Sequence, residues 1–238
     1  MVRSRTVQTQ QDARPRKKGD PINTELQRKE SKQSNRIWFS SFMVILALTL
    51  LSYANSVRNQ FVFDDIYLIA TNPHIKGIQK IPNLLGFGKQ MVFYRPVRTV
   101  TYALDYTLNK NLWHFFGGYK GYDKGLNPLG FHISNIAYHL ITSLLVFLVI
   151  GRLTGSPRIA FFAASMFALH PVHTDSVTYL SGRRDILCAL FYLAGFYFFL
   201  CYRKTNHFRF VFAALLAYLL SLGSKEMGVT LPALFLGY

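Results

Sequence analysis

The segments HPVHTD (residues 170–175) and SGRRD (residues 181–185) place two histidines, two arginines and two carboxylates within sixteen residues. Long apolar runs flank this cluster, residues 159–169 before it and residues 186–202 after it. Ionisable side chains are costly in or beside a bilayer, so a dense cluster of them next to membrane spans indicates a functional site. The apolar runs therefore predict a membrane protein, and the cluster predicts where its site lies.

Clusters of comparable density occur at two other places. One is FVFDD (residues 61–65), which follows the first apolar run, and the other is SKE (residues 224–226), near the end of the chain. We expect the topology to bring all three clusters to the same side of the membrane.

The composition is that of a multispan membrane protein. Half of the 238 residues are hydrophobic, 16% are aromatic and 16% are charged. Runs of about twenty uncharged residues are long enough to cross a bilayer core. The net charge is +16, but the basic residues gather in the first 36 positions and in short connectors between apolar runs. This is the positive-inside pattern, so we predict no nucleic-acid partner.

The start of the chain predicts a tail followed by a membrane anchor. Residues 1–36 are polar and basic. Such a segment cannot bury enough apolar surface to fold, so we expect a disordered cytoplasmic tail. The first apolar run begins only at Ile37 and indicates an uncleaved signal anchor that leads the chain out of the cytoplasm. Residues 58–127 then form the first external loop of a transmembrane domain that covers residues 37–238.

The third apolar run is unusually short. The run at residues 159–169 has eleven residues, whereas a lipid-exposed helix needs about twenty to cross the bilayer. This run must still cross, because residues 186–202 span fully and the basic pair at residues 203–204 marks the cytoplasmic side again. The HPVHTD segment is therefore expected to line a cavity that faces outward. The other runs are residues 129–150, which lead inward, residues 210–222, which lead outward, and residues 227–238, where the chain stops about halfway through a sixth span.

Within the external loop, residues 95–108 have the periodicity of a helix lying on the membrane surface. The polar face consists of Arg95, Arg98, Tyr102 and Asp105, and we expect it to point toward water or a ligand. The two arginines are therefore candidate substrate contacts. The apolar face consists of Val97, Val100, Thr101, Leu104 and Leu108. The predicted fold class is an all-α transmembrane helical bundle with one interfacial helix.

The two cysteines, Cys188 and Cys201, lie in one predicted helix. Thirteen residues at 1.5 Å each separate them by roughly 20 Å, which is too far for a disulfide. We expect them to be small apolar residues of the core.

Asp64 and Asp65 are the candidate general base. A second carboxylate beside the first raises the pKa of the first, toward the value that a base needs. The alternative is a solvated turn or a helix cap, and the sequence leaves both open.

Arg183 and Arg184 precede a membrane helix whose positive N-terminal dipole faces them. Together they could hold an anion such as a phosphate at the lipid headgroup level. The alternative is snorkelling of both side chains to membrane phosphates. Lys225 and Glu226 are candidate substrate contacts, and the favoured alternative is a local ion pair that orients their neighbours.

His170, His173 and Asp175 could ligate a divalent metal, but their spacing matches no zinc signature. Hydrogen bonding or substrate positioning is the favoured interpretation. The sequence names no cofactor, and a divalent metal stays the alternative.

Several motifs, in their order along the chain, resemble one family. They are FDD (residues 63–65), YRP (residues 94–96), HPVHTDSV (residues 170–177) with GRRD (residues 182–185), and SKEM (residues 224–227). They are similar to the motifs of the transmembrane and tetratricopeptide-repeat family of O-mannosyltransferases, from about residue 36 to the C-terminus. The central stretch and the serine before Lys225 look closer to prokaryotic relatives. This favours a bacterial inner membrane over the endoplasmic reticulum membrane.

The resemblance implies a GT-C fold and an inverting glycosyltransferase on the extracytoplasmic side of the membrane. The sugar, typically mannose, would pass from a polyprenyl-phosphate donor to a Ser or Thr hydroxyl of a protein acceptor. Asp64 or Asp65 would match the acidic pair that carries the base, and Arg183 the arginine of the glycine-arginine motif. Two departures matter: Asp175 stands where the family usually has glutamate, and the chain contains no tetratricopeptide repeats.

A non-enzymatic membrane protein, either a transporter or an assembly scaffold, is the second hypothesis. A transporter is expected to carry ionisable groups in mid-span and to show repeated halves. Here the charges collect at one side and no internal repeat is apparent, so the enzyme is favoured.

Overall fold

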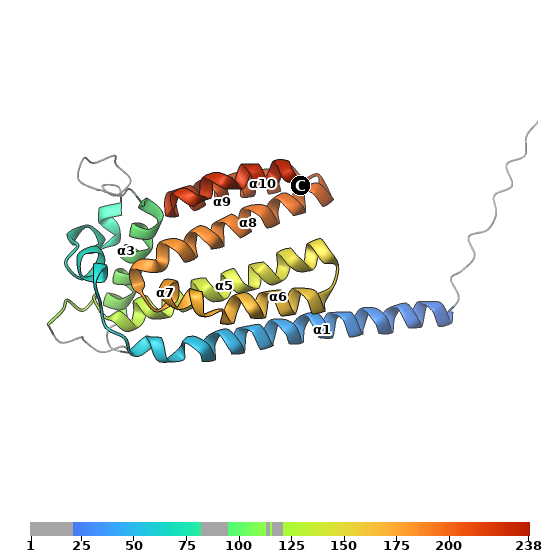
Figure 1. Ribbon diagram of the computed structural model, residues 1–238, viewed down its shortest axis with the longest axis horizontal. Helices are drawn as coiled ribbons and strands as arrows, with labels where there is room; N and C mark the ends of the chain where they lie inside the picture. Colours follow the sequence, from blue (N-terminus) through green and yellow to red (C-terminus); the bar gives the residue numbers. More distant parts are fainter. Residues whose placement is uncertain (1–20, 82–94, 113–114, 116–120) are drawn as a thin grey trace, which may run out of the picture. The chain divides into compact units, whose positions relative to one another are not determined.

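The computed structural model describes residues 21–81, 95–112, 115 and 121–238. Within these ranges the chain is helical and contains no strand (Figure 1). Three segments are long and apolar enough to cross a membrane: Asn35–Arg58, Pro128–Thr154 and Leu180–Thr205. The predicted all-α, multispan fold class is therefore confirmed.

The first helix is longer than the sequence predicted. Helix α1 covers Pro21–Tyr53, whereas we expected disorder up to Arg36. The correction has a local cause. Gln, Glu, Lys and Arg are frequent in this stretch and are good helix formers, so a helix nucleated by the apolar span extends into it at little cost. Residues 1–20 lie outside the described residues.

Residues 39–238 form one compact unit, and the arrangement below is that of this unit. Helix α5 (Pro128–Thr154) packs against α6 (Pro157–Leu169) and α8 (Arg183–Thr205), and α8 packs against α9 (Phe208–Ser224). The chain continues into α10 (Leu231–Gly237). Helix α6 has 13 residues, so the expected short third run is confirmed.

The helix ends follow capping rules. The Asn127 side chain accepts a hydrogen bond from the Leu129 N–H at 3.0 Å, with Pro128 in the first turn of α5. Gly155, at φ 67°, ends the same helix in the left-handed conformation that glycine tolerates. Helix α6 ends just before Pro171, whose ring cannot continue it.

Short helical turns and one longer helix form the loop that connects α1 to α5. The turns are η1 (Ala54–Arg58), η2 (Ile66–Ala70), η3 (Pro73–Ile75) and η4 (Ile78–Lys80), and the longer helix is α3 (Pro96–Asn111). Figure 1 shows α3, α7 (Thr174–Val177) and the start of α8 at the same end of the bundle.

Helix α3 lies where the periodicity predicted it, but its polar face points the other way. Arg98, Tyr102 and Asp105 are buried inside the protein, while Leu104 and Leu108 are exposed. The expectation that this polar face meets water was wrong. It packs instead against α5 and α8, because the arginine at the start of α8 needs buried acceptors.

Candidate functional site

The three charged clusters meet at one end of the bundle. The Asp65 carboxylate of the first cluster accepts hydrogen bonds from Ser181 of the second. Asp185 of the second cluster forms an ion pair with Lys225 of the third. Glu226 then pairs with Arg95 at the start of α3, at 3.1 Å. Segments more than 100 residues apart in the chain therefore contribute to a single site.

Asp65 is a structural anchor of this site. Its side chain is 1% exposed, and one carboxylate oxygen accepts from the Ser181 N–H at 2.8 Å and the Ser181 hydroxyl at 2.6 Å. The other oxygen accepts from the Val62 N–H at 3.2 Å. Burial raises the pKa of Asp65, and these three hydrogen bonds oppose that rise. Because both oxygens already accept hydrogen bonds, this carboxylate is held in place.

Asp64 differs from Asp65 in its exposure to solvent and in its contacts. Its side chain is exposed, and the carboxylate has no partner among the described residues. The backbone is held instead: the Asp64 N–H donates to the Tyr179 hydroxyl at 3.3 Å. The preceding residue, Phe63, has φ 48°, a left-handed conformation that bulky residues rarely adopt. Strain of this kind tends to occur at functional sites. After this turn at Phe63, the Asp64 side chain is exposed and the Asp65 side chain is buried.

Arg183 is enclosed by protein groups. Its side chain is fully buried and forms an ion pair with Asp105 of α3. Its Nε donates to Asn135 of α5 at 2.6 Å, and Nη2 donates to the Phe131 carbonyl at 2.9 Å. The guanidinium carbon also lies 4.6 Å from the centre of the Tyr102 ring. The sequence suggested that Arg183 holds a phosphate at the lipid headgroup level. In the structure its side chain lies instead at the junction of α3, α5 and α8.

The neighbouring cations surround the exposed side of the site. Arg184 lies 3.4 Å from Asp185, which is also the partner of Lys225, and Arg95 pairs with Glu226. These three cations thus share two carboxylates.

Arg98 stands apart from these pairs. It is 6% exposed, and its guanidinium has no hydrogen bond or ion pair among the described residues. Burial lowers its pKa, and the nearby positive charges of Arg95 and Arg184 lower it further. Tyr102, whose ring centre lies 5.9 Å from the guanidinium carbon, and Asp64 act in the opposite direction. An arginine stays charged under such conditions. A buried guanidinium without a hydrogen bond or ion pair, next to two other arginines, has the chemistry to bind an anion.

The HPVHTD segment lies at the same end of the bundle but outside this ionic network. The His173 ring packs against Phe167 at 4.4 Å and His139 at 5.2 Å between ring centres, and burial lowers its pKa. His170 accepts from the Val172 N–H through Nδ1 at 3.2 Å, and Asp175 is exposed. No three such side chains come close enough to hold a metal ion in the part of the chain that the structure describes. The metal alternative therefore gains no support.

The backbone of this segment matters more than its side chains. A Cβ atom on Gly182 would come within 2.6 Å of the Asp175 carbonyl oxygen and 2.8 Å of the Ser176 Cα. Residues 175–176 therefore press directly on the turn that begins α8, which sets the position of the two arginines that follow.

Sequence reasoning missed four residues that hold the site together: Asp105, Asn135, Tyr179 and Ser181. Asp105 had been assigned to a solvent-facing helix surface. Asn135 carried a signal, because a lone amide in an apolar span is expensive unless it is paired. Tyr179 and Ser181 carried no distinguishing signal in a loop that is rich in hydroxyl groups.

Comparisons with known proteins found similar chains among protein O-mannosyl-transferases. The chain is 31% identical over 208 residues to protein O-mannosyl-transferase F38B6.6 of Caenorhabditis elegans, which covers 81% of the chain and 27% of that relative. It is 31% identical over 180 residues to protein O-mannosyl-transferase TMTC4 of Mus musculus, covering 66% of the chain and 22% of the relative. It is 28% identical over 202 residues to TMTC3 of Homo sapiens, covering 79% and 20%.

The chain thus spans about a quarter or less of the length of these curated relatives. No family model matches it, and no solved structure matches it significantly, so the expected GT-C fold stays a prediction. The similarity nevertheless covers 66–81% of the chain. The chain belongs to a TMTC-like family of membrane proteins.

Proposed function

We propose that this chain is the membrane part of a protein O-mannosyltransferase. It would transfer mannose from a polyprenyl-phosphate donor to a Ser or Thr hydroxyl of a protein on the extracytoplasmic side. One observation carries the proposal. The exposed carboxylate of Asp64 acts electrostatically on the buried guanidinium of Arg98, and neither group has a hydrogen bond or ion pair among the described residues. The relatives are protein O-mannosyl-transferases by name, which supports protein mannosylation. The family resemblance suggests the polyprenyl-phosphate donor, and a cluster of cations at the end of a membrane bundle supports it.

The chemistry follows from these two groups. The acceptor hydroxyl oxygen attacks the anomeric carbon and loses its proton to the Asp64 carboxylate. The bond from the anomeric carbon to the phosphate oxygen breaks, and the leaving polyprenyl phosphate keeps the electron pair. Arg98, with Arg95 and Arg184 beside it, stabilises the negative charge that develops on that phosphate. A single displacement of this kind inverts the configuration at the anomeric carbon.

Two buried residues position these groups. Asp65 fixes the acidic loop to the turn before α8 through Ser181. Arg183 fixes α3, which carries Arg95 and Arg98, to α5 and α8. In this proposal neither residue touches the substrate.

Arg98→Gln tests the anion site. The substitution removes a charge-assisted contact worth about 1.5–3 kcal/mol, so KM for a mannosyl-phosphoryl-polyprenol donor should rise about 10- to 100-fold. The assay follows transfer of radiolabelled mannose to a Ser/Thr-containing peptide by the full chain in proteoliposomes. Arg58→Gln, at the exposed end of η1, is the matched control and should leave KM unchanged. Equal effects of both substitutions would refute a specific anion site at Arg98.

Cysteine accessibility tests the side of the membrane. In a background without Cys188 and Cys201, single cysteines replace Asp64, Arg184 and Glu226, and an impermeant maleimide is applied to intact cells. We expect labelling at all three positions from outside. Asn206→Cys, in the connector between α8 and α9, should react only after permeabilisation. Labelling of the three site positions only after permeabilisation would overturn the extracytoplasmic assignment.

A further inference from the structure

The candidate base follows a turn that needs support. Phe63, the residue before Asp64, has φ 48°, and a bulky side chain makes this left-handed conformation unfavourable. Two hydrogen bonds close the turn from within. The Asp65 N–H donates to the Val62 carbonyl at 2.9 Å, and the Ile66 N–H donates to the preceding Phe63 carbonyl at 3.2 Å. Both bonds are local, so they shape the turn without fixing its direction relative to the helices.

Two side-chain contacts tie this turn to the segment that precedes α8. The Asp65 carboxylate holds one end of the turn through Ser181. The Tyr179 hydroxyl holds the base itself, because it accepts the Asp64 N–H at 3.3 Å. Among the described residues this is the only hydrogen bond that links Phe63 or Asp64 to another part of the chain. A held backbone also fixes the direction of its Cα–Cβ bond, so this contact sets where the Asp64 carboxylate points.

The segment that carries Tyr179 is itself anchored to two long helices. The Val177 carbonyl accepts a hydrogen bond from the Asn135 side chain of α5 at 3.2 Å. The Leu180 carbonyl accepts one from the Tyr102 hydroxyl of α3 at 2.8 Å. Both donors are buried. Because Tyr179 lies between these two anchored residues, its hydroxyl can hold the turn rather than follow it.

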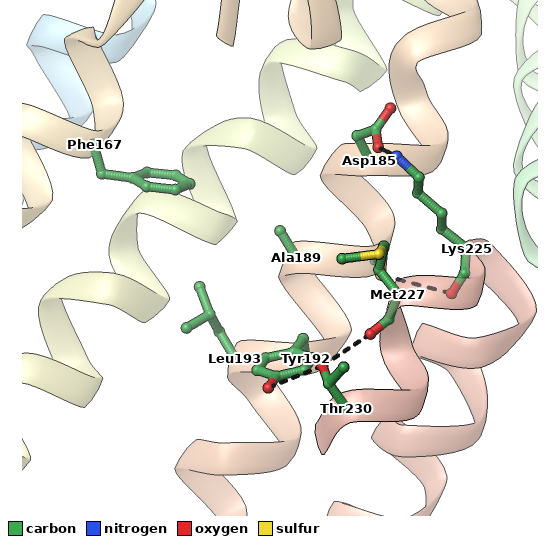
Figure 2. A pocket seen from close by; sticks show the side chains of 9 residues that line it. Phe167, Asp185, Ala189, Tyr192, Leu193, Lys225, Met227 and Thr230 are labelled. Carbon is green, nitrogen blue, oxygen red and sulfur yellow. Dashed lines mark hydrogen bonds and ion pairs between the residues drawn. The ribbon is translucent and has the colours of Figure 1, made fainter. Parts of the chain in front are cut away.

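The chain beyond Tyr179 is fixed as well. Gly182 packs so closely against residues 175–176 that a Cβ atom on it would not fit. In the first turn of α8, Asp185 forms an ion pair with Lys225, and both line the mostly apolar pocket shown in Figure 2. Packing against the HPVHTD segment and an ion pair to the end of α9 thus hold the segment that presents the Tyr179 hydroxyl.

We propose that Tyr179 is a positioning residue for the candidate base. Its hydroxyl holds the strained turn at Phe63 and so directs the Asp64 carboxylate toward the acceptor hydroxyl. The role of Asp64 rests on the proposed function, whereas the support of the turn rests on contacts alone. Without this support Phe63 returns to a conformation that suits its side chain, and the Asp64 side chain turns away from the site. The HPVHTD segment then acts through its packing and not through its ionisable groups.

Tyr179→Phe removes the hydroxyl and keeps the ring. With saturating donor and peptide, kcat should fall about 10- to 100-fold, because a small misplacement of a catalytic group is costly, while donor KM changes less than about twofold. Tyr67→Phe removes the hydroxyl of an exposed tyrosine from the same loop. This matched control should leave kcat and KM unchanged. An unchanged kcat in Tyr179→Phe would overturn the proposal.

Phe63→Asn tests whether Tyr179 acts through the turn. Asparagine adopts the left-handed conformation more readily than phenylalanine, so the turn should keep its shape without the hydroxyl. The double variant Phe63→Asn/Tyr179→Phe should therefore recover kcat to within about threefold of Phe63→Asn alone. A double variant as slow as Tyr179→Phe would show that the hydroxyl acts on the substrate directly, and the positioning role would be wrong.

Hydrogen exchange separates this inference from the transfer reaction. Exchange is followed by NMR of ¹⁵N-aspartate-labelled protein in nanodiscs, with the helical Asp105 and Asp185 amides as references. In Tyr179→Phe the Asp64 and Asp65 amides should exchange about 2- to 10-fold faster, the range for one lost hydrogen bond. In the double variant only the Asp64 amide should do so, because the turn stays closed.

The outcomes of the exchange measurement are distinct. Faster exchange at both amides in Tyr179→Phe, in a protein that shows no mannosyl transfer before substitution, would uphold the support of the turn and refute the proposed enzyme. Faster exchange at the Asp64 amide alone in Tyr179→Phe would show that the turn closes without the hydroxyl. That result, or unchanged exchange at both amides, would overturn the inference whether or not the protein transfers mannose.

Discussion

Asp64→Asn should lower the rate of mannosyl transfer about 100- to 10,000-fold, the usual contribution of a general base. The asparagine amide has nearly the same shape but cannot take the proton of the acceptor hydroxyl. Because the Asp64 carboxylate has no partner among the described residues, the substitution breaks no side-chain contact there, and the backbone bond to Tyr179 remains. The measurement is kcat with saturating donor and peptide. Donor KM should change little.

Asp65→Asn is the informative comparison for this experiment. An amide at this position keeps one oxygen as the acceptor for Ser181 but turns an NH2 group toward the Val62 N–H. An NH2 group cannot accept a hydrogen bond, so the Val62 N–H loses its acceptor. We therefore expect a lower Tm and a lower yield of folded protein, with the remaining molecules keeping measurable transfer. If Asp64→Asn kept more than a tenth of the activity while Asp65→Asn abolished it at unchanged Tm, the base would be Asp65 instead.

The meeting of the three charged clusters was predictable because it depends only on the direction of each span. The short helix α6 packs along α5, so the chain returns to the same end before SGRRD and again before SKE (Figure 1). The structure adds the contacts: Asp65 with Ser181, and Asp185 with Lys225. A pattern of apolar runs is enough for the first statement but carries no information about the second.

The sequence could not predict which of the two adjacent arginines, Arg183 or Arg184, is buried. Successive residues on a helix point about 100° apart, so only one of Arg183 and Arg184 can face the bundle. Which one does so depends on Asp105 and Asn135, and both lie on other helices. The same holds for α3: its polar face turned inward because Arg183 occupies the interior. Amphipathic periodicity marks the two faces of a helix, but it does not distinguish a wet surface from a buried polar junction.

The acidic pair illustrates the same limit at a shorter range. A carboxylate pair in a loop could be a catalytic base or a helix cap, and the sequence left both open. In the structure the two carboxylates have different surroundings: Asp65 accepts local and long-range hydrogen bonds, none of which caps the helical turn that follows, and Asp64 is exposed. The left-handed conformation of Phe63 produces this difference. No residue type in FVFDD signals it, because glycine or asparagine would be the usual choice there.

Arg183→Met should destabilise the protein more than any other single substitution at the site. It leaves the Asp105 carboxyl 4% exposed and without its cation, and removing one partner of a buried pair costs about 3–5 kcal/mol. The neighbouring Arg184→Met is the matched control. Arg184 is about a third exposed, and its loss should cost about 1 kcal/mol or less. The measurement is Tm in nanodiscs, together with the donor KM of the folded fraction.

The double variant Arg183→Met/Asp105→Leu tests whether the fall in Tm comes from the broken ion pair or from two independent losses of contacts. It removes both buried charges at once, so it should recover part of the lost Tm, whereas two independent losses would add. Arg183 supports α3 through Asp105, and α3 carries Arg95 and Arg98, so incomplete recovery of donor KM is expected even where Tm returns. The neighbouring arginines should thus give opposite results: a fall in Tm for Arg183→Met and a rise in donor KM at nearly constant Tm for Arg184→Met. An Arg183→Met protein with an unchanged Tm and a raised donor KM would show instead that Arg183 contacts the phosphate, as the motif alone suggested.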